Sequence, residues 1–215
     1  MKTKNCVEAR GKIVKVKNGG LGYGAITLLV KVGPKESVIT FTLANAINPD
    51  ISIGDIVEIK GHIRSTGTYT DDNGKRRSDQ FFVADSVKPA RTRLEMMCGI
   101  KGKAFPEHYF RCCIIGAFIN FYKSGVDWGR IYVETASDTN RNTRITLNYY
   151  LKGRLRKPEM LTRGDEIAIV ADINVTAKDY ELEDGSIEKR KFENLYAEDV
   201  VIVNEGDGET IPLLA

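Results

Sequence analysis

The chain has few of the residues that build metal and redox sites. Of its 215 residues, four are cysteine (Cys6, Cys98, Cys112 and Cys113) and two are histidine, and the cysteines show no Cys-x-x-Cys spacing. A structural zinc site needs four ligands of these types, usually in closely spaced pairs. We therefore predict no bound metal and no cofactor.

Long apolar runs are also missing. No segment approaches the roughly 18 apolar residues of a membrane helix, and the first residues lack the apolar core of a secretory signal. We expect no membrane partner and a cytoplasmic or nucleoid-associated protein, in the host cell cytoplasm if a phage encodes it.

Charge is nearly balanced overall but unevenly distributed. The net charge is +3, from 32 Lys and Arg against 29 Asp and Glu. Residues 198–215 contain five acids and no Lys or Arg, so the rest of the chain has 32 basic and 24 acidic residues, a net of +8. A basic body with an acidic tail is suited to a polyanionic partner, although inert surfaces have the same composition.

The strongest feature present is an internal repeat. The segment 23–28 recurs at 128–133, an offset of 105 residues, and 84–87 recurs at 197–200, an offset of 113. An offset that only grows, by small steps, is produced by loop insertions in two copies of one fold. The predicted parts are domain 1 (1–90), a linker (91–104), domain 2 (105–203) and an acidic, disordered tail (204–215).

Alternation of apolar and polar residues is the dominant pattern, and it agrees between the copies. Val57, Ile59, Gly61 and Ile63 alternate in the first copy, and their counterparts alternate in the second. This pattern is typical of strands with one buried face. Each copy is thus predicted to have five strands, which in the first copy cover about 7–17, 25–32, 37–43, 55–65 and 80–87.

The first strand of each copy breaks its alternation at two neighbouring apolar residues. These are Ile13-Val14, beside Gly11, and Phe118-Ile119, beside Gly116. The break indicates a bulge or sharp bend, and a long, bent first strand lets five strands curl into a small closed barrel. We predict an all-β protein of two tandem five-stranded barrels with the oligonucleotide/oligosaccharide-binding (OB) fold.

Comparison of the two copies explains several residues that could otherwise suggest a reactive or binding site as core residues. Cys112 stands where the first copy has Val7, which predicts a small buried thiol. Phe41, Phe118 and Phe121 are predicted to lie in the core. No catalytic set is common to the two copies, so we expect a protein that is not an enzyme.

The segment 54–76 resembles the fourth strand and following hairpin of the bacterial and phage single-stranded DNA-binding (SSB) proteins. The family pattern is Gly and a polar residue, an apolar strand, Gly-x-Ile/Leu-Arg, an aromatic residue and a Gly-containing turn. The second copy keeps most of this pattern but has Asn174 in place of Arg64. The resemblance implies that single-stranded DNA (ssDNA) wraps over one face of each barrel, with this hairpin as a clamp. It implies contacts at Arg64, Tyr69, Lys75, Arg76 and Arg77 in the first copy and at Tyr180, Lys189, Arg190 and Lys191 in the second.

The residues themselves point to the same function. Binding of single strands without sequence preference needs flat aromatic surfaces for bases and cations for phosphates. Some aromatic residues stand at loop edges or on outward strand positions, and one loop of the second copy is basic. These candidates are Tyr23, Trp128, Tyr132, Tyr150, Arg154, Arg156 and Lys157. The alternatives are aromatic residues that cover the barrel ends and a basic loop that is only solvated.

These patterns predict a non-catalytic protein that binds and protects ssDNA in replication, recombination or repair. Because the family commonly uses four barrels, we expect a homodimer, and the tail could recruit replication or recombination proteins. Two alternatives stay open. One is an OB protein that binds other proteins, as a phage structural or conjugation component, and the other is an RNA-binding accessory protein.

Overall fold

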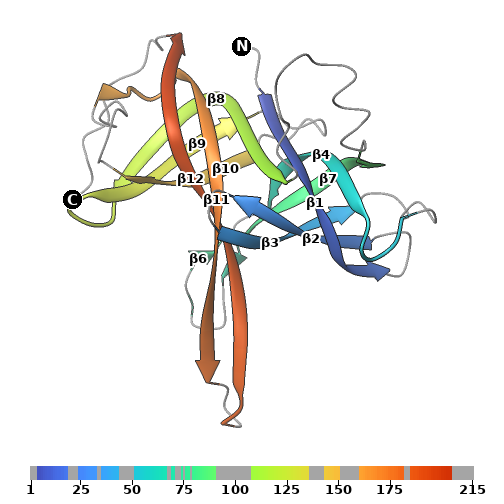
Figure 1. Ribbon diagram of the computed structural model, residues 1–215. Coiled ribbons are helices and arrows are strands. Elements are labelled where there is room, and N and C mark those ends of the chain that lie inside the picture. Colours follow the sequence, from blue (N-terminus) through green and yellow to red (C-terminus); the bar gives the residue numbers. More distant parts are fainter. Residues whose placement is uncertain are drawn as a thin grey trace.

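The computed structural model describes most of the chain. The described residues are 4–18, 24–32, 35–43, 51–66, 69–70, 74, 76–77, 79–90, 108–135, 143–150, 160–181 and 185–204. They form strands almost throughout (Figure 1). Within these ranges no helix has the length and apolar character needed to cross a membrane.

Five strands of the first half form a closed circuit. They are β1 (Lys4–Asn18), β2 (Gly24–Val32), β3 (Lys35–Leu43), β4 (Ile56–Ser65) and β7 (Gln80–Pro89). β1 pairs with β2, β2 with β3, β3 with β7, β7 with β4, and β4 with β1. The β3–β7 pairing is parallel and the others are antiparallel. This closed sheet, which we call the first barrel, confirms the predicted all-β class and the five-stranded barrel expected for the first copy.

The second half repeats the circuit. Its strands are β8 (Tyr109–Lys123), β9 (Trp128–Thr135), β10 (Thr143–Tyr150), β11 (Glu166–Glu181) and β12 (Ile187–Asn204). The order of pairing is the same, and the parallel contact between β10 and β12 is one residue pair, Asn148 with Tyr196. We call this circuit the second barrel. The predicted linker lies outside the described residues, and the domain bounds stay predictions.

The predicted breaks in both first strands are present. The register of β1 on β2 shifts between Ile13 and Lys15, and that of β8 on β9 shifts between Phe118 and Asn120. The adjacent glycines allow the bend, because a Cβ on Gly11 or on Gly116 would lie 2.4 Å from a backbone carbonyl oxygen of the neighbouring strand. Glycine is therefore needed at both positions for steric reasons.

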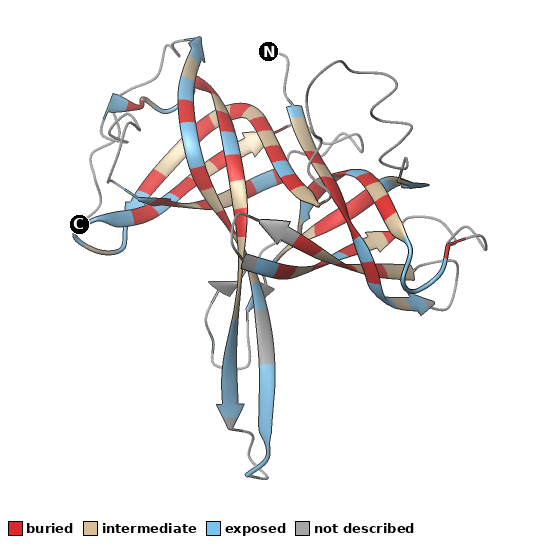
Figure 2. Cartoon of the chain, in the orientation of Figure 1, coloured by how far each residue is buried: buried red, intermediate tan, exposed pale blue. Residues whose placement is uncertain are grey.

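Inward side chains of both circuits form the hydrophobic core. Figure 2 shows buried positions that alternate with more exposed ones along the strands. Phe41, Phe118 and Phe121 are buried, as predicted. Cys112 is buried as well, and desolvation raises the pKa of its thiol.

The two halves are joined by a strand pairing between β1 and β8. Val7 pairs with Cys112, its own counterpart in the repeat, and the pairs on either side are Cys6 with Cys113 and Glu8 with Arg111. The two halves are thus related by an approximate two-fold axis through the Val7–Cys112 pair. Strands β4, β1, β8 and β11 lie side by side across this junction.

A reciprocal pair of side-chain contacts also joins the barrels. The Gln80 side chain donates from Nε2 to the Thr146 carbonyl (2.9 Å) and accepts at Oε1 from the Thr146 amide (2.6 Å). Glu193, the counterpart of Gln80, accepts at Oε1 from the amide of Thr40, the counterpart of Thr146 (2.8 Å). Each barrel therefore satisfies backbone groups on a strand edge of the other.

Strands β11 and β12 continue beyond the second barrel as a two-stranded arm. Their pairing extends without a break to Glu181 with Ile187. Figure 1 shows the arm projecting from the body of the molecule. In the first half the corresponding hairpin contains two short strands, β5 (Tyr69–Thr70) and β6 (Arg76–Arg77), which pair with each other.

Candidate nucleic-acid interface

The outer surface of the second barrel gathers aromatic side chains from four strands. Arg130 on β9 is paired with Tyr122 on β8 and with Asn148 on β10, and Asn148 is paired with Tyr196 on β12. Directly paired residues place their side chains on the same face of a sheet. In the adjacent row, Trp128 is paired with Tyr150. We call this surface the aromatic face, and it consists of Tyr122, Trp128, Arg130, Tyr132, Tyr150 and Tyr196.

Three of these rings remain open to solvent. Tyr122 and Tyr150 are each 50% exposed and Trp128 is 38% exposed, while Tyr132 is half-buried. The Arg130 side chain is exposed among them. Exposed apolar surface of this kind commonly marks a binding site, and a guanidinium beside the rings supplies a cation for a phosphate.

Two of the tyrosines form a preorganised stack. The rings of Tyr150 and Tyr196 are parallel within 4°, with centroids 5.4 Å apart. Burial raises the pKa of the Tyr196 phenol, a hydrogen bond to Tyr150 raises it further, and a hydrogen bond to Asn174 lowers it. Because its neighbour holds the Tyr150 ring, little rotamer freedom remains to be lost when a flat ligand stacks on it.

Sequence reasoning found part of this surface. Trp128, Tyr132 and Tyr150 were predicted and lie together on it. Tyr122 and Tyr196 were missed, and their counterparts in the first copy, Lys17 and Val83, are not aromatic. For Tyr196 a signal was available in the sequence, because Tyr196 stands between the apolar residues Leu195 and Ala197 and alternation therefore predicts an outward position. The structure agrees, since Leu195 and Ala197 are both buried.

The arm holds the second group of predicted residues. The Tyr180 ring is partly exposed and packs at a tilt against Phe192, with centroids 6.1 Å apart. Lys189 is exposed near the arm tip, and Arg190 and Lys191 follow it on β12 with backbone partners Lys178 and Ala177. The side chains of Arg190 and Lys191 lie outside the described part of the structure. The arm thus carries an aromatic pair and a basic segment away from the barrel.

The first half places fewer of its predicted residues. Arg64 is exposed on β4, opposite Phe81 of β7. The backbone of Tyr69 pairs with that of Arg77, next to Arg76, while the side chains of all three lie outside the described part. Five further candidates are residues that the structure does not describe: Tyr23, Lys75, Arg154, Arg156 and Lys157.

The matching outer face of the first barrel has fewer aromatic side chains in the described residues, where Phe81 is half-buried on the outward side of β7 opposite Arg64. Thr27 is the counterpart of Tyr132, and Val83 is the counterpart of Tyr196. The hydroxyls of Thr27 and Thr40 lie 3.3 Å apart across the β2–β3 pair. Hydroxyl and aliphatic side chains offer no flat π surface, so the two barrel faces differ in their ability to stack on bases.

No metal site was found in the ranges that the structure covers, where no three His, Cys, Asp or Glu side chains gather closely enough to hold an ion.

The fold has parallels among solved structures along the whole chain. The single-stranded DNA binding protein from Thermus aquaticus superimposes with a TM-score of 0.55 at 10% identity, over 97% of this chain and 97% of that chain. A deletion variant of the same protein gives a TM-score of 0.54 at 12% identity, over 98% and 97%. The mitochondrial single-stranded DNA binding protein Rim1 from S. cerevisiae covers 45% of this chain and 96% of its own, with a TM-score of 0.32 at 14% identity.

These neighbours define the class of fold. No protein-family model matches the chain, and no curated protein matches it. At such low identities the likeness shows the fold alone. The structural neighbours are single-stranded DNA binding proteins, so the predicted resemblance to that family is confirmed at the level of the fold.

Proposed function

We propose that this protein binds ssDNA without catalysis and that the aromatic face of the second barrel is its main contact surface. The observation that carries this proposal is the gathering of four tyrosines, one tryptophan and one arginine on one outer surface. Base stacking on aromatic rings contributes about 1–3 kcal/mol per base and tolerates any base, because every base has a π face. The SSB fold of the structural neighbours supports the same partner.

The arm extends the proposed contact surface. Its Tyr180–Phe192 pair offers another apolar ring surface, and Lys178 adds positive charge on the same face of the arm, while Lys189 is paired with Asp179 on the other face. A strand of DNA that crosses the aromatic face would meet this basic segment next. The clamp implied by the SSB resemblance is thus part of the proposal for the second half.

The wider biological role follows as a proposal from this binding. Coating exposed strands would protect them during replication, recombination or repair, in the cytoplasm or at the nucleoid. The expected homodimer is checked by light scattering of the purified protein. Recruitment of replication or recombination proteins by the acidic tail is checked by pull-down with and without residues 205–215.

The single tryptophan gives a direct test of DNA binding. We expect the fluorescence of Trp128 to be quenched when poly-dT is added to the full-length protein. Polarisation titrations with poly-dT, a matched duplex and poly-U then compare the ligand classes. Weaker binding of duplex and poly-U than of poly-dT is the expected order.

Variants locate the contact. Tyr150→Ala and Trp128→Ala should each weaken poly-dT binding roughly 5- to 150-fold, which corresponds to the stacking energy of one base. Thr27→Ala, on the matching face of the first barrel, is the control and should change affinity less than twofold. Circular dichroism confirms that each variant is folded.

Each alternative has its own outcome. Tighter binding of poly-U than of poly-dT would favour the RNA-binding function. Unchanged tryptophan emission and no binding at low salt would refute the proposal and favour a protein-binding module.

A further inference from the structure

Two cysteines face each other where the halves of the chain meet. Cys6 on β1 and Cys113 on β8 are direct partners in the antiparallel pairing that joins the two barrels. Both are free thiols and both are half-buried, unlike the fully buried Cys112 beside them. Their side chains therefore lie on the outer face of the sheet, on the side opposite to Cys112.

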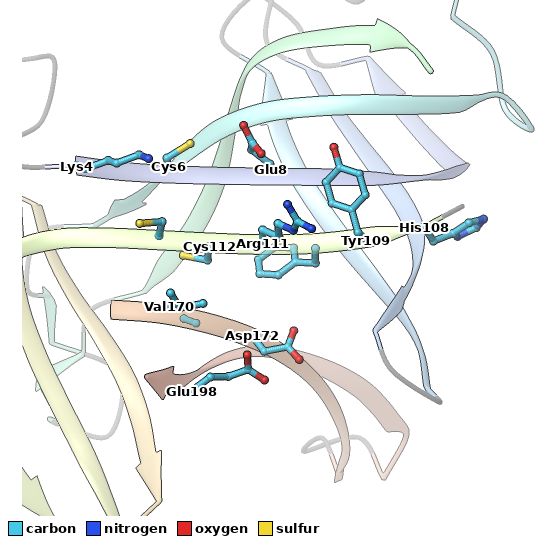
Figure 3. Close-up of a pocket in the computed structure, with 13 residues that line it drawn as sticks. Lys4, Cys6, Glu8, His108, Tyr109, Arg111, Cys112, Val170, Asp172 and Glu198 are labelled. Carbon is cyan, nitrogen blue, oxygen red and sulfur yellow. The ribbon is translucent and has the colours of Figure 1, made fainter. Parts of the chain in front are cut away.

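This face is open to small molecules. Cys6 and Cys113 line a groove of about 570 Å³ across β1, β8 and β11. Figure 3 shows Cys6 between Lys4 and Glu8 on β1, with Arg111 on the neighbouring β8. A reagent in solution can thus reach the pair without unfolding of the protein.

The spacing of the two backbones allows a disulfide. Directly opposite residues of an antiparallel pair have Cα atoms about 4.5 or 5.5 Å apart, depending on the hydrogen-bonding position. Disulfides in proteins span Cα distances of about 4.4–6.8 Å. Either position in the pairing is therefore compatible with a bond between the two sulfurs.

The fold itself does not require thiols at these positions. The approximate two-fold axis relates the Cys6–Cys113 pair to the Glu8–Arg111 pair, because the counterpart of Cys6 is Arg111 and the counterpart of Cys113 is Glu8. The same site in the repeat thus holds two long, oppositely charged side chains. Packing does not explain why the other site holds two cysteines.

We propose that Cys6 and Cys113 form a reversible disulfide that joins β1 to β8, and so ties the first half of the chain covalently to the second. This inference is independent of the proposed DNA binding.

The proposed oxidant is a small-molecule disulfide such as glutathione disulfide. One cysteine thiolate attacks a sulfur of glutathione disulfide, forms a mixed disulfide and releases one glutathione thiolate. The second cysteine thiolate then attacks the protein sulfur of that mixed disulfide and releases the second glutathione. The two cysteines are oxidised, two glutathione molecules are produced, and the two thiol protons pass through water to the glutathione thiolates.

The surroundings of Cys6 lower its reactivity at neutral pH. Burial raises the pKa of the Cys6 thiol, as do the Glu8 carboxylate and the Cys113 thiol, while Lys4 and Lys60 lower it. Because the thiolate is the attacking species, most of Cys6 is unreactive at pH 7. Oxidation should therefore be followed to equilibrium over hours.

The experiment compares full-length protein equilibrated with excess glutathione disulfide and with dithiothreitol. After alkylation of the remaining thiols, non-reducing peptide mapping should find a peptide linked between Cys6 and Cys113 within one chain. The bond closes a long loop, so the thermal midpoint should rise by about 5 to 10 °C in the oxidised protein and return after reduction.

Variants assign the bond to these two sulfurs. Cys112→Val, which introduces the residue of the matching position, and Cys98→Ser should both keep the linked peptide and the shift in midpoint. Cys6→Ser and Cys113→Ser should both lose them. The oxidised form of each serine variant is compared with its own reduced form, so a variant that is less stable than wild type still gives a clear result. If Cys6→Ser or Cys113→Ser fails to fold, the remaining variant gives the same test.

Several outcomes would overturn the inference. The first is that Cys6 and Cys113 each carry a glutathione or remain free thiols after equilibration with glutathione disulfide. Another is a linked peptide that disappears in Cys112→Val, and a third is a bond found only between two chains on a non-reducing gel.

Discussion

Replacing Gln80 with alanine should remove two hydrogen bonds that hold the barrels together. The wild-type side chain makes two hydrogen bonds to the backbone of Thr146, at 2.9 and 2.6 Å, and both span the two halves of the chain. Alanine removes both partners and leaves the Thr146 amide and carbonyl to water. At about 1 kcal/mol net for each hydrogen bond, the expected loss is about 2 kcal/mol of unfolding free energy.

The assay is thermal and urea denaturation of Gln80→Ala beside wild type. For a protein of this size, about 2 kcal/mol corresponds to a fall in melting temperature of about 4–8 °C. Gln80→Glu is the informative second variant, because a carboxylate can accept from the Thr146 amide but cannot donate to its carbonyl. The Gln80→Glu variant should lose about half as much unfolding free energy as Gln80→Ala. At the matching site a glutamate already has this role, because Glu193 accepts from the Thr40 amide.

Lys88→Ala is the matched control. Lys88 is exposed at the other end of the same strand, so this change tests the general effect of alanine in β7. Its melting temperature should stay within about 1 °C of wild type. If Gln80→Ala also melts within that range, the two Gln80–Thr146 hydrogen bonds do not stabilise the junction and the reasoning is wrong.

Three further predictions concern charge and packing. The logarithm of the ssDNA affinity should fall with the logarithm of salt concentration with a slope of about −3 to −4, if about 4 to 6 phosphates are neutralised by the basic body; a slope near zero in polarisation titrations would contradict it. Residues 205–215 lie outside the described residues, and deleting them should raise ssDNA affinity modestly at low salt because their carboxylates repel phosphates. The gain should vanish at high salt, and unfolding of the truncated protein would show that the tail is structural. Gly116→Ala should lower the unfolding free energy measured by urea denaturation by about 1–3 kcal/mol, because the alanine Cβ would lie 2.4 Å from the Glu134 carbonyl oxygen. A wild-type urea midpoint would show that the strands adjust freely to the extra methyl group.

The sequence determined the local features of the fold. Period-two alternation predicted the strands, and the structure has them at nearly the same bounds. The paired apolar residues beside Gly11 and Gly116 predicted the bends where the registers shift. These predictions succeeded because inward and outward positions of a strand, and the space that a glycine provides, depend on neighbours within a few residues.

The sequence also determined part of the binding surface. Tyr132 and Tyr150 were predicted to face outward from their alternation alone, and they do. The repeat supplied a second, independent reading of each strand, which is why Cys112 could be identified as a core residue from its match to Val7. The basic loop candidates, Arg154, Arg156 and Lys157, had no such support, since loop residues follow no period.

Only the tertiary structure decided which strands lie next to one another. Alternation tells which face of a strand is buried but does not name its partner, because many strands offer similar faces and edges. The stack of Tyr150 on Tyr196 depends on the single β10–β12 pair, which connects residues far apart in the chain. In the same way, the pairing of β1 with β8 brings Cys6 opposite Cys113, because two long first strands each had an edge that the other could satisfy.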